Sequence, residues 1–151
     1  MHHLFRNVKV IRSCTDIAAG STVYQGAIVD TRGFRGAAFE AILGTLTTLA
    51  VGNLHVEGAN TSATTDMVDL EASAVAFTDA QQGAVLLCDV GRPLRRYMRP
   101  VVHRATANAV INSMSAYLYN PVQAAVTHST GDYVMGSTFL TEATTGASTG
   151  S

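Results

Sequence analysis

The chain consists largely of short runs in which apolar residues alternate with polar ones, and turn-forming residues separate these runs. A period of two is typical of half-buried β-strands, whereas an amphipathic helix needs apolar residues at every third or fourth position. No long pattern of the helical kind is present, although the alanine-rich residues 68–77 are also compatible with a helical turn. Strands are expected near residues 5–12, 22–30, 36–43, 49–57, 67–77, 85–90, 97–104 and 109–119. We therefore predict an all-β fold, an antiparallel, jelly-roll-like β-sandwich of about 7–8 strands.

The character of the chain changes at Asn120–Pro121. A chain of 151 residues has the size of one domain, and we expect a β-sandwich domain over residues 1–120. Residues 121–151 include apolar side chains such as Tyr133 and Phe139 but contain no compact core of their own. We interpret them as a C-terminal arm or tail that docks on a neighbouring subunit. The alternative is a C-terminal hairpin that completes the sandwich.

Charge is scarce in this sequence. Charged residues make up 14% of the chain, and the net charge is −1. A surface so poor in charge is expected to be partly buried against copies of itself, so we predict a homo-oligomer, with a trimer favoured over a dimer. Nine of the ten basic residues are arginines, which suit protein interfaces because they are weakly hydrated and form several hydrogen bonds at once. The near-neutral balance argues against general binding of nucleic acid.

Residues 91–104 carry five arginines and two prolines within a strand-like pattern. Because proline is tolerated mainly at strand starts, edges and bulges, the pattern predicts an edge strand whose pairing is limited or is continued by another chain. The candidate partner-binding residues are Arg92, Arg95, Arg96, Tyr97 and Arg99, together with Tyr133 and Phe139 of the arm. Two other interpretations stay open. The arginines could be solvated groups that prevent edge-to-edge aggregation, or they could form with the tyrosine a groove for nucleic acid.

No recognisable catalytic motif occurs in the sequence. The five histidines lack metal-binding spacing, and the two cysteines are not arranged as a metal-binding pair. Asp66, Asp69 and Glu71 lie close together, but they lack the glycine-containing spacing of a calcium loop and are interpreted as a solvated loop. We therefore expect no enzymatic activity, no catalytic residue, no cofactor and no metal site.

Neither a secretory signal nor an apolar run of membrane-spanning length, about 20 residues, is evident in the sequence. We expect no membrane partner and assembly in a cytoplasm.

Two parts of the chain together resemble small accessory virion proteins of tailed bacteriophages. The first part runs from VDTRGF (29–34) into AFEAILG (38–44). The second contains TDA (78–80), LLCDV (86–90), RP (92–93), RY (96–97), RPVV (99–102) and TANAVI (106–111). The resemblance covers roughly residues 20–119 and rests on the order of these pieces, since each alone is weak.

The resemblance implies a structural protein of the virion, a cement or decoration protein that binds the major capsid protein on the outer capsid surface. Two other functions are compatible with such a sandwich. One is a head fibre or spike base, or a carbohydrate-binding domain, and the other is a head–tail connector or tail component.

Overall fold

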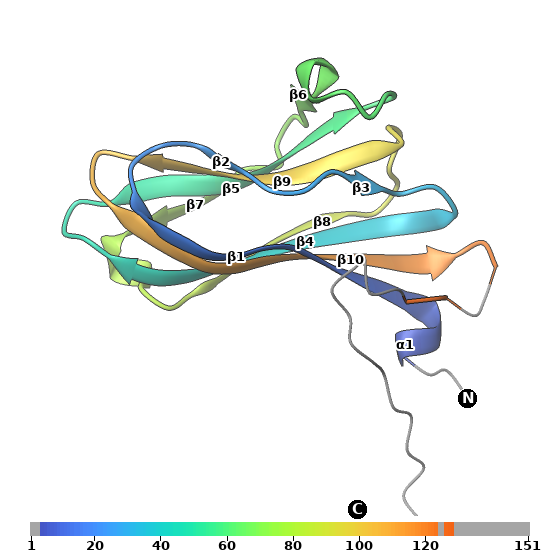
Figure 1. Cartoon of the computed structure of the whole chain (residues 1–151), viewed down its shortest axis with the longest axis horizontal. Coiled ribbons are helices and arrows are strands. Elements are labelled where there is room, and N and C mark those ends of the chain that lie inside the picture. Colours follow the sequence, from blue (N-terminus) through green and yellow to red (C-terminus); the bar gives the residue numbers. More distant parts are fainter. Residues whose placement is uncertain (1–3, 124–125, 129–151) are drawn as a thin grey trace, which may run out of the picture.

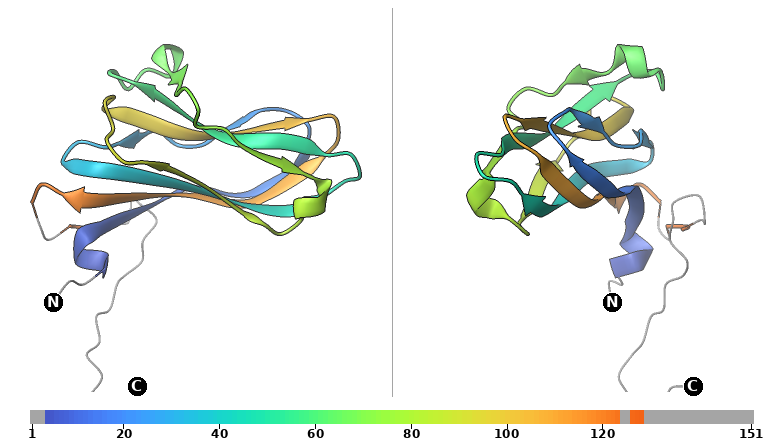
Figure 2. Two further views of the ribbon diagram at one scale, coloured as in Figure 1. Left: turned by 180° about the vertical axis from the view of Figure 1, so that it is seen from behind. Right: turned by 60° about the vertical axis from the view of Figure 1, so that its left-hand side comes forward.

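The computed structural model describes residues 4–123 and 126–128, which form two antiparallel sheets packed face to face (Figures 1 and 2). The first sheet contains, in spatial order, β1 (Val8–Gly20), β10 (Ala109–Pro121), β4 (Phe34–Leu46) and β8 (Val85–Val90). The second sheet is centred on β9 (Tyr97–Ala105) and β5 (Val51–Ala59). On its outer edges, β2 (Tyr24–Gln25) and β3 (Val29–Asp30) pair with β9, whereas β6 (Val68–Asp69) and β7 (Val75–Thr78) pair with β5. The short helices are α1 (Leu4–Asn7), η1 (Thr64–Asp66) and η2 (Asp79–Gln81).

The connectivity is that of a jelly roll. β2 and β3 together fill one strand position beside β9, and β6 and β7 together fill one position beside β5. The ten strands of the described chain therefore occupy eight positions, four in each sheet. Successive positions along the chain lie in opposite sheets, except that β5 is followed by β6 and β7 in its own sheet, and this is the order that two interlocked Greek keys require. The predicted all-β, jelly-roll-like sandwich is confirmed.

The core lies between the sheets and is made of the inward-facing residues of the long strands. Alternation along each strand sends one set of side chains inward, and the register of the ladders aligns these sets across each sheet. The largest side chains that are fully buried include Phe39, Leu43, Leu54, Met98, Ile111, Met114 and Leu118. Burying each such side chain contributes roughly 1.5–3 kcal/mol to folding. The space between the sheets is thus filled by the protein's own side chains.

Two expected strands are broken into pairs of short ones. The sequence pattern predicted continuous strands over residues 22–30 and 67–77, but pairing is limited to β2 and β3 in the first and to β6 and β7 near the second. In the second segment Ser73 donates its backbone N–H to the Leu70 carbonyl, and Ala72 has a positive φ of 60°. This turn separates β6 from β7. The helical turns lie at η1 and η2, outside residues 68–77.

The prediction that the arginine-rich strand lies at an edge is wrong. β9 is an interior strand, flanked by β5 on one side and by β2 and β3 on the other. Pro100 is tolerated there because its carbonyl accepts the N–H of Gly26 at 2.8 Å, so its ring nitrogen faces the gap between β2 and β3. Position 26 in this gap requires glycine. A Cβ there would clash with the Ser13 hydroxyl and lie 2.9 Å from Cγ of Pro100.

None of the helices in the described part of the chain has the length and apolar character that a transmembrane helix requires.

Candidate partner-binding surface

Arg96 is the arginine of the candidate set that is most firmly tied to a neighbouring strand while remaining exposed. Its guanidinium binds Asp30 of β3 through both carboxylate oxygens, with Nη2–Oδ2 at 2.8 Å and Nε–Oδ1 at 3.1 Å. The hydrogen bond from Arg96 is the main cause that lowers the pKa of Asp30 below its ordinary value. The same guanidinium lies 4.8 Å from the centroid of the Tyr97 ring, a cation–π contact.

Arg99 makes a buried ion pair within the chain. Its Nε donates to Oε2 of Glu57 at 2.5 Å, and only 6% of the Arg99 side chain and 13% of the Glu57 side chain are exposed. The pairing follows from the register, which places the two residues directly opposite each other on β9 and β5. Arg99 therefore keeps little surface with which to contact a partner.

The other two arginines of the candidate set differ from each other. Arg95 donates from Nη1 to the Gly58 carbonyl at 2.9 Å and is half-buried. Arg92 lies in the loop between β8 and β9 and is exposed, and Leu94 in the same loop is 91% exposed. The fifth arginine of this segment, Arg104, is buried and donates to the carbonyls of Ala18, Thr22 and Ala109 at 2.8–2.9 Å. Its desolvation lowers the pKa of the guanidinium.

Arg95 and Arg96 lie at one end of the sandwich. Thr31 donates its backbone N–H to the Arg96 carbonyl at 2.8 Å, which joins the loop after β3 to the start of β9. A hollow of about 400 Å³ lies between these segments, lined by Thr31, Arg32, Gly33, Phe34, Asn60, Pro93, Leu94, Arg95 and Arg96. The hollow presents an exposed leucine next to guanidinium groups. Such a surface can bind an apolar side chain flanked by carboxylates.

The structure thus brings Arg92, Arg95, Arg96 and Tyr97 to one end of the molecule and engages Arg99 internally. Tyr133 and Phe139 lie outside the described residues. The role of the whole set in partner binding stays a prediction.

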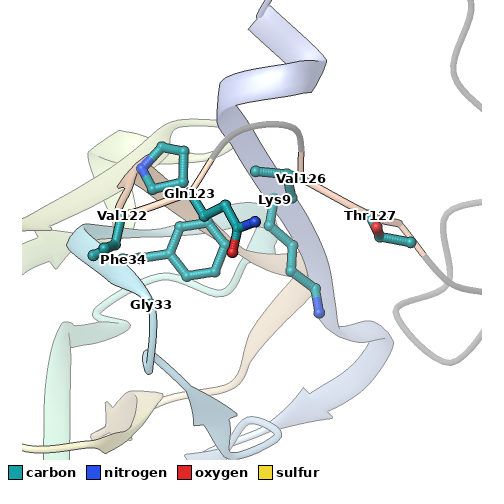
Figure 3. A pocket seen from close by; sticks show the side chains of 8 residues that line it. Lys9, Gly33, Phe34, Val122, Gln123, Val126 and Thr127 are labelled. Atoms are coloured by element: carbon teal, nitrogen blue, oxygen red, sulfur yellow. The ribbon is translucent and has the colours of Figure 1, made fainter.

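A second hollow lies where the C-terminal segment leaves the sandwich (Figure 3). Its volume is about 440 Å³, and its lining comes from β1, the start of β4 and the residues that follow β10. Val122 donates its N–H to the Gly33 carbonyl at 2.8 Å, and Val126 donates to the Arg6 carbonyl at 3.0 Å. The first described residues of the predicted arm therefore lie against the sandwich. Of residues 121–151, the structure describes 121–123 and 126–128.

The outer face of the first sheet is a surface that the sequence analysis did not identify. Val85 and Leu87 of β8 point outward and are 51% and 59% exposed. Beside them, Tyr117 donates to Glu40 at 3.2 Å and Tyr119 donates to Asp89 at 2.6 Å. The Asp89 hydrogen bond is the main cause that raises the pKa of Tyr119 to about 12. Alternation within residues 85–90 places Val85, Leu87 and Asp89 on one side of the strand and could have indicated this face.

The outer face of the second sheet carries a further cluster, formed by His55, Glu57 and Asp69. Its ligand atoms lie within 4.8 Å of one another, which is a geometry suited to a metal ion. The sequence analysis placed Asp69 in a solvated loop and expected no metal site, because the histidine and the aspartate are distant in the sequence.

A scan against protein-family models and a search of curated proteins found no match to this chain. The fold and the surfaces described above define a jelly-roll protein with a buried apolar core and exposed apolar side chains on its exterior.

Proposed function

We propose that this protein is a non-enzymatic structural protein of a bacteriophage virion, of the cement or decoration kind. It binds the outer surface of the capsid through the major capsid protein and stabilises the shell. Assembly takes place in the cytoplasm of the bacterial host.

The observation that carries the proposal is the meeting of the two segments on which the phage resemblance rests. Asp30 and Arg96 belong to different segments, 66 positions apart in the sequence, and they form a bidentate ion pair. Thr31 adds hydrogen bonds to the carbonyls of Arg95 and Arg96. The segments with the unusual residue order thus form one structural unit, which lines the hollow beside Leu94.

The fold agrees with this role. Jelly rolls are widespread among viral capsid and lectin domains, and a cement protein needs a rigid body with binding surfaces on its exterior. The filled interior provides the rigidity. A capsid offers many symmetric copies of one site, so weak contacts made by an oligomer add up through multivalency.

Self-association is part of the proposal, with a trimer favoured. β8 is an edge strand of the first sheet, and its outer backbone edge has no strand neighbour among residues 4–123 and 126–128. Exposed Val85 and Leu87 adjoin this edge. Burying them against a second copy would remove apolar area from water and cover an unpaired strand edge.

A capsid-binding assay with two matched leucine variants tests the proposal. Leu94 lies at the hollow, whereas Leu49, which is 68% exposed, lies beyond the far end of β4 at the opposite end of the sandwich. Purified protein is mixed with capsids that lack it, and the bound fraction is measured by co-sedimentation. We expect Leu94→Ala to reduce binding about tenfold and Leu49→Ala to bind normally. Failure of the wild-type protein to sediment with capsids would overturn the proposal.

A further inference from the structure

We infer that the outer face of the second sheet holds a binding site for a divalent transition-metal ion, with Zn²⁺ favoured, formed by His55, Glu57 and Asp69. His55 and Glu57 are two positions apart on β5 and therefore point to the same face. Asp69 belongs to β6 and is the direct register partner of Glu57. One ligand atom from each residue lies within 4.8 Å of the other two.

The orientation of His55 suits a metal ligand. Its Nδ1 lies 2.9 Å from Oδ1 of Asn53, which can only accept a hydrogen bond, so Nδ1 carries the proton. In the neutral imidazole the lone pair is then on Nε2, which faces Oδ1 of Asp69 at 3.4 Å. An oxygen acceptor that fixes the tautomer of a ligating histidine is the usual outer partner in metal sites.

The spacing between the ligand atoms of His55 and Asp69 fits one ion. Two acceptors that face each other repel unless a proton or a cation lies between them. Ligand atoms bound to Zn²⁺ at about 2.0–2.2 Å with tetrahedral geometry are separated by about 3.3–3.6 Å. The distance of 3.4 Å between Nε2 of His55 and Oδ1 of Asp69 agrees with that separation.

Glu57 is held in place by its ion pair. Arg99 binds Oε2, and the carboxylate has a second oxygen, Oε1, with which to bind a cation. A histidine binds a metal ion as the neutral imidazole, so the two carboxylates and the Arg99 guanidinium give the cluster a formal charge of −1, which attracts a dication. Nitrogen and oxygen donors of this kind suit Zn²⁺ and its neighbours in the transition series.

The open side of the site faces a hollow of about 340 Å³. Asn53, His55 and Asp69 line it together with Leu70, Ala72, Ser73, Ala74 and His103. Water can complete the coordination from this side. An ion bound here would link β6, which has only two residue pairs with β5, to the body of the sheet.

The site is tested by titrating Zn²⁺ into the full chain after treatment with EDTA, using calorimetry, and by following the visible absorption of Co²⁺ as a second probe. We expect one ion per chain at the site and a micromolar dissociation constant. Saturation should raise the unfolding temperature by about 5 °C, since binding to the folded state alone stabilises it. Because His2 and His3 also offer imidazoles, the titration is repeated in a His2→Ala/His3→Ala background, where the ion of the site should remain.

Two carboxamide variants distinguish metal binding at this site from nonspecific binding by acidic residues. Asp69→Asn should weaken binding at least tenfold, whereas Glu71→Gln, an exposed residue of the same segment, should leave it unchanged. The Asp69 side chain is 73% exposed, so its variant is expected to fold, and circular dichroism verifies this. His55→Ala should abolish the Co²⁺ absorption. Binding that disappears in the His2→Ala/His3→Ala background, or that is equal in Asp69→Asn and the wild type, would overturn the assignment.

Discussion

The outer faces of the two sheets differ in the contacts that their side chains make within the chain. The second sheet carries ionic groups that are paired within the chain, namely Asp30–Arg96 and Glu57–Arg99. The first sheet carries Val85 and Leu87 at an open edge, beside two tyrosines that are hydrogen-bonded to carboxylates. Ion pairs between side chains therefore join neighbouring strands of the second sheet, whereas the first sheet exposes apolar side chains at the β8 edge.

An arginine-rich strand does not by itself mark an interface. Arg99 and Arg104 have partners within the chain, and their burial leaves them little contact with solvent. The exposed apolar groups of the first sheet are better placed to bury area against another copy. We expect self-association through the first sheet and capsid contact through the hollow beside Leu94.

The largest expected effect is on the stability of the second sheet. Arg99→Ala leaves Glu57 buried without its partner and should lower the free energy of unfolding by about 3–5 kcal/mol. Arg92→Ala, which removes an exposed arginine, should change it by less than about 0.5 kcal/mol. Urea denaturation followed by circular dichroism measures both. A double replacement, Arg99→Met with Glu57→Leu, should recover most of the loss, and equal stability of Arg99→Ala and the wild type would mean that the pair does not hold the sheet.

The next effect concerns self-association. Leu87→Asp places a carboxylate at the proposed contact and should weaken association about 100-fold, because an unpaired buried charge is costly. The matched control is Val68→Asp, since Val68 is 54% exposed but lies on β6 in the second sheet. Sedimentation velocity at tens of micromolar should show a smaller species for Leu87→Asp alone. Loss of association in the control and not in Leu87→Asp would assign the contact to the second sheet.

A smaller effect is expected from the exposed pair between Asp30 and Arg96. Because the folded state lowers the pKa of Asp30, the pair stabilises the protein above the ordinary pKa of 3.8, and this contribution is lost as the pH falls through the lowered value. The wild type should therefore be more stable than Asp30→Asn at pH 7, and the difference should shrink as the pH falls below 3.8. Thermal unfolding at a series of pH values measures it. A difference that does not vary with pH would show that the carboxylate charge is not involved.

The smallest effect is the alkaline titration of Tyr119 on the first sheet. Its pKa of about 12 arises mainly from the hydrogen bond to Asp89, so Asp89→Asn should lower it toward the ordinary value of 10. Because the pKa is raised in the folded state, the associated stability is present below pH 10 and is lost as the pH rises through about 12. The absorbance of tyrosinate, with Tyr119→Phe subtracted, follows the titration. No change in Asp89→Asn would assign the shift to burial instead.

The sequence was sufficient to predict the fold class because alternation is a local property of each strand. It was not sufficient to place β9, because the tolerance of Pro100 depends on a gap between β2 and β3 that lies about 75 residues earlier in the chain. Breaks in expected strands were missed for a related reason. The turn at Ala72 has a positive φ without a glycine to announce it.

The candidate sites show the same limit. Alternation alone places His55 and Glu57 on one face, but the contribution of Asp69 requires the register between β5 and β6. The contact of Arg96 with Asp30 likewise depends on the pairing of β3 with β9. Residue types could be recognised from the sequence, whereas their partners are set by strand pairing across the sheet.

Electron microscopy of intact particles tests the central proposal most directly. Particles assembled with the protein and particles lacking it are imaged, and the difference density is located on the capsid. The account predicts density at symmetric positions over the whole outer shell, with a jelly-roll body in each copy and its Leu94 end facing the major capsid protein. Density confined to one vertex, or no difference in the shell, would contradict it and would favour a connector, tail or spike component.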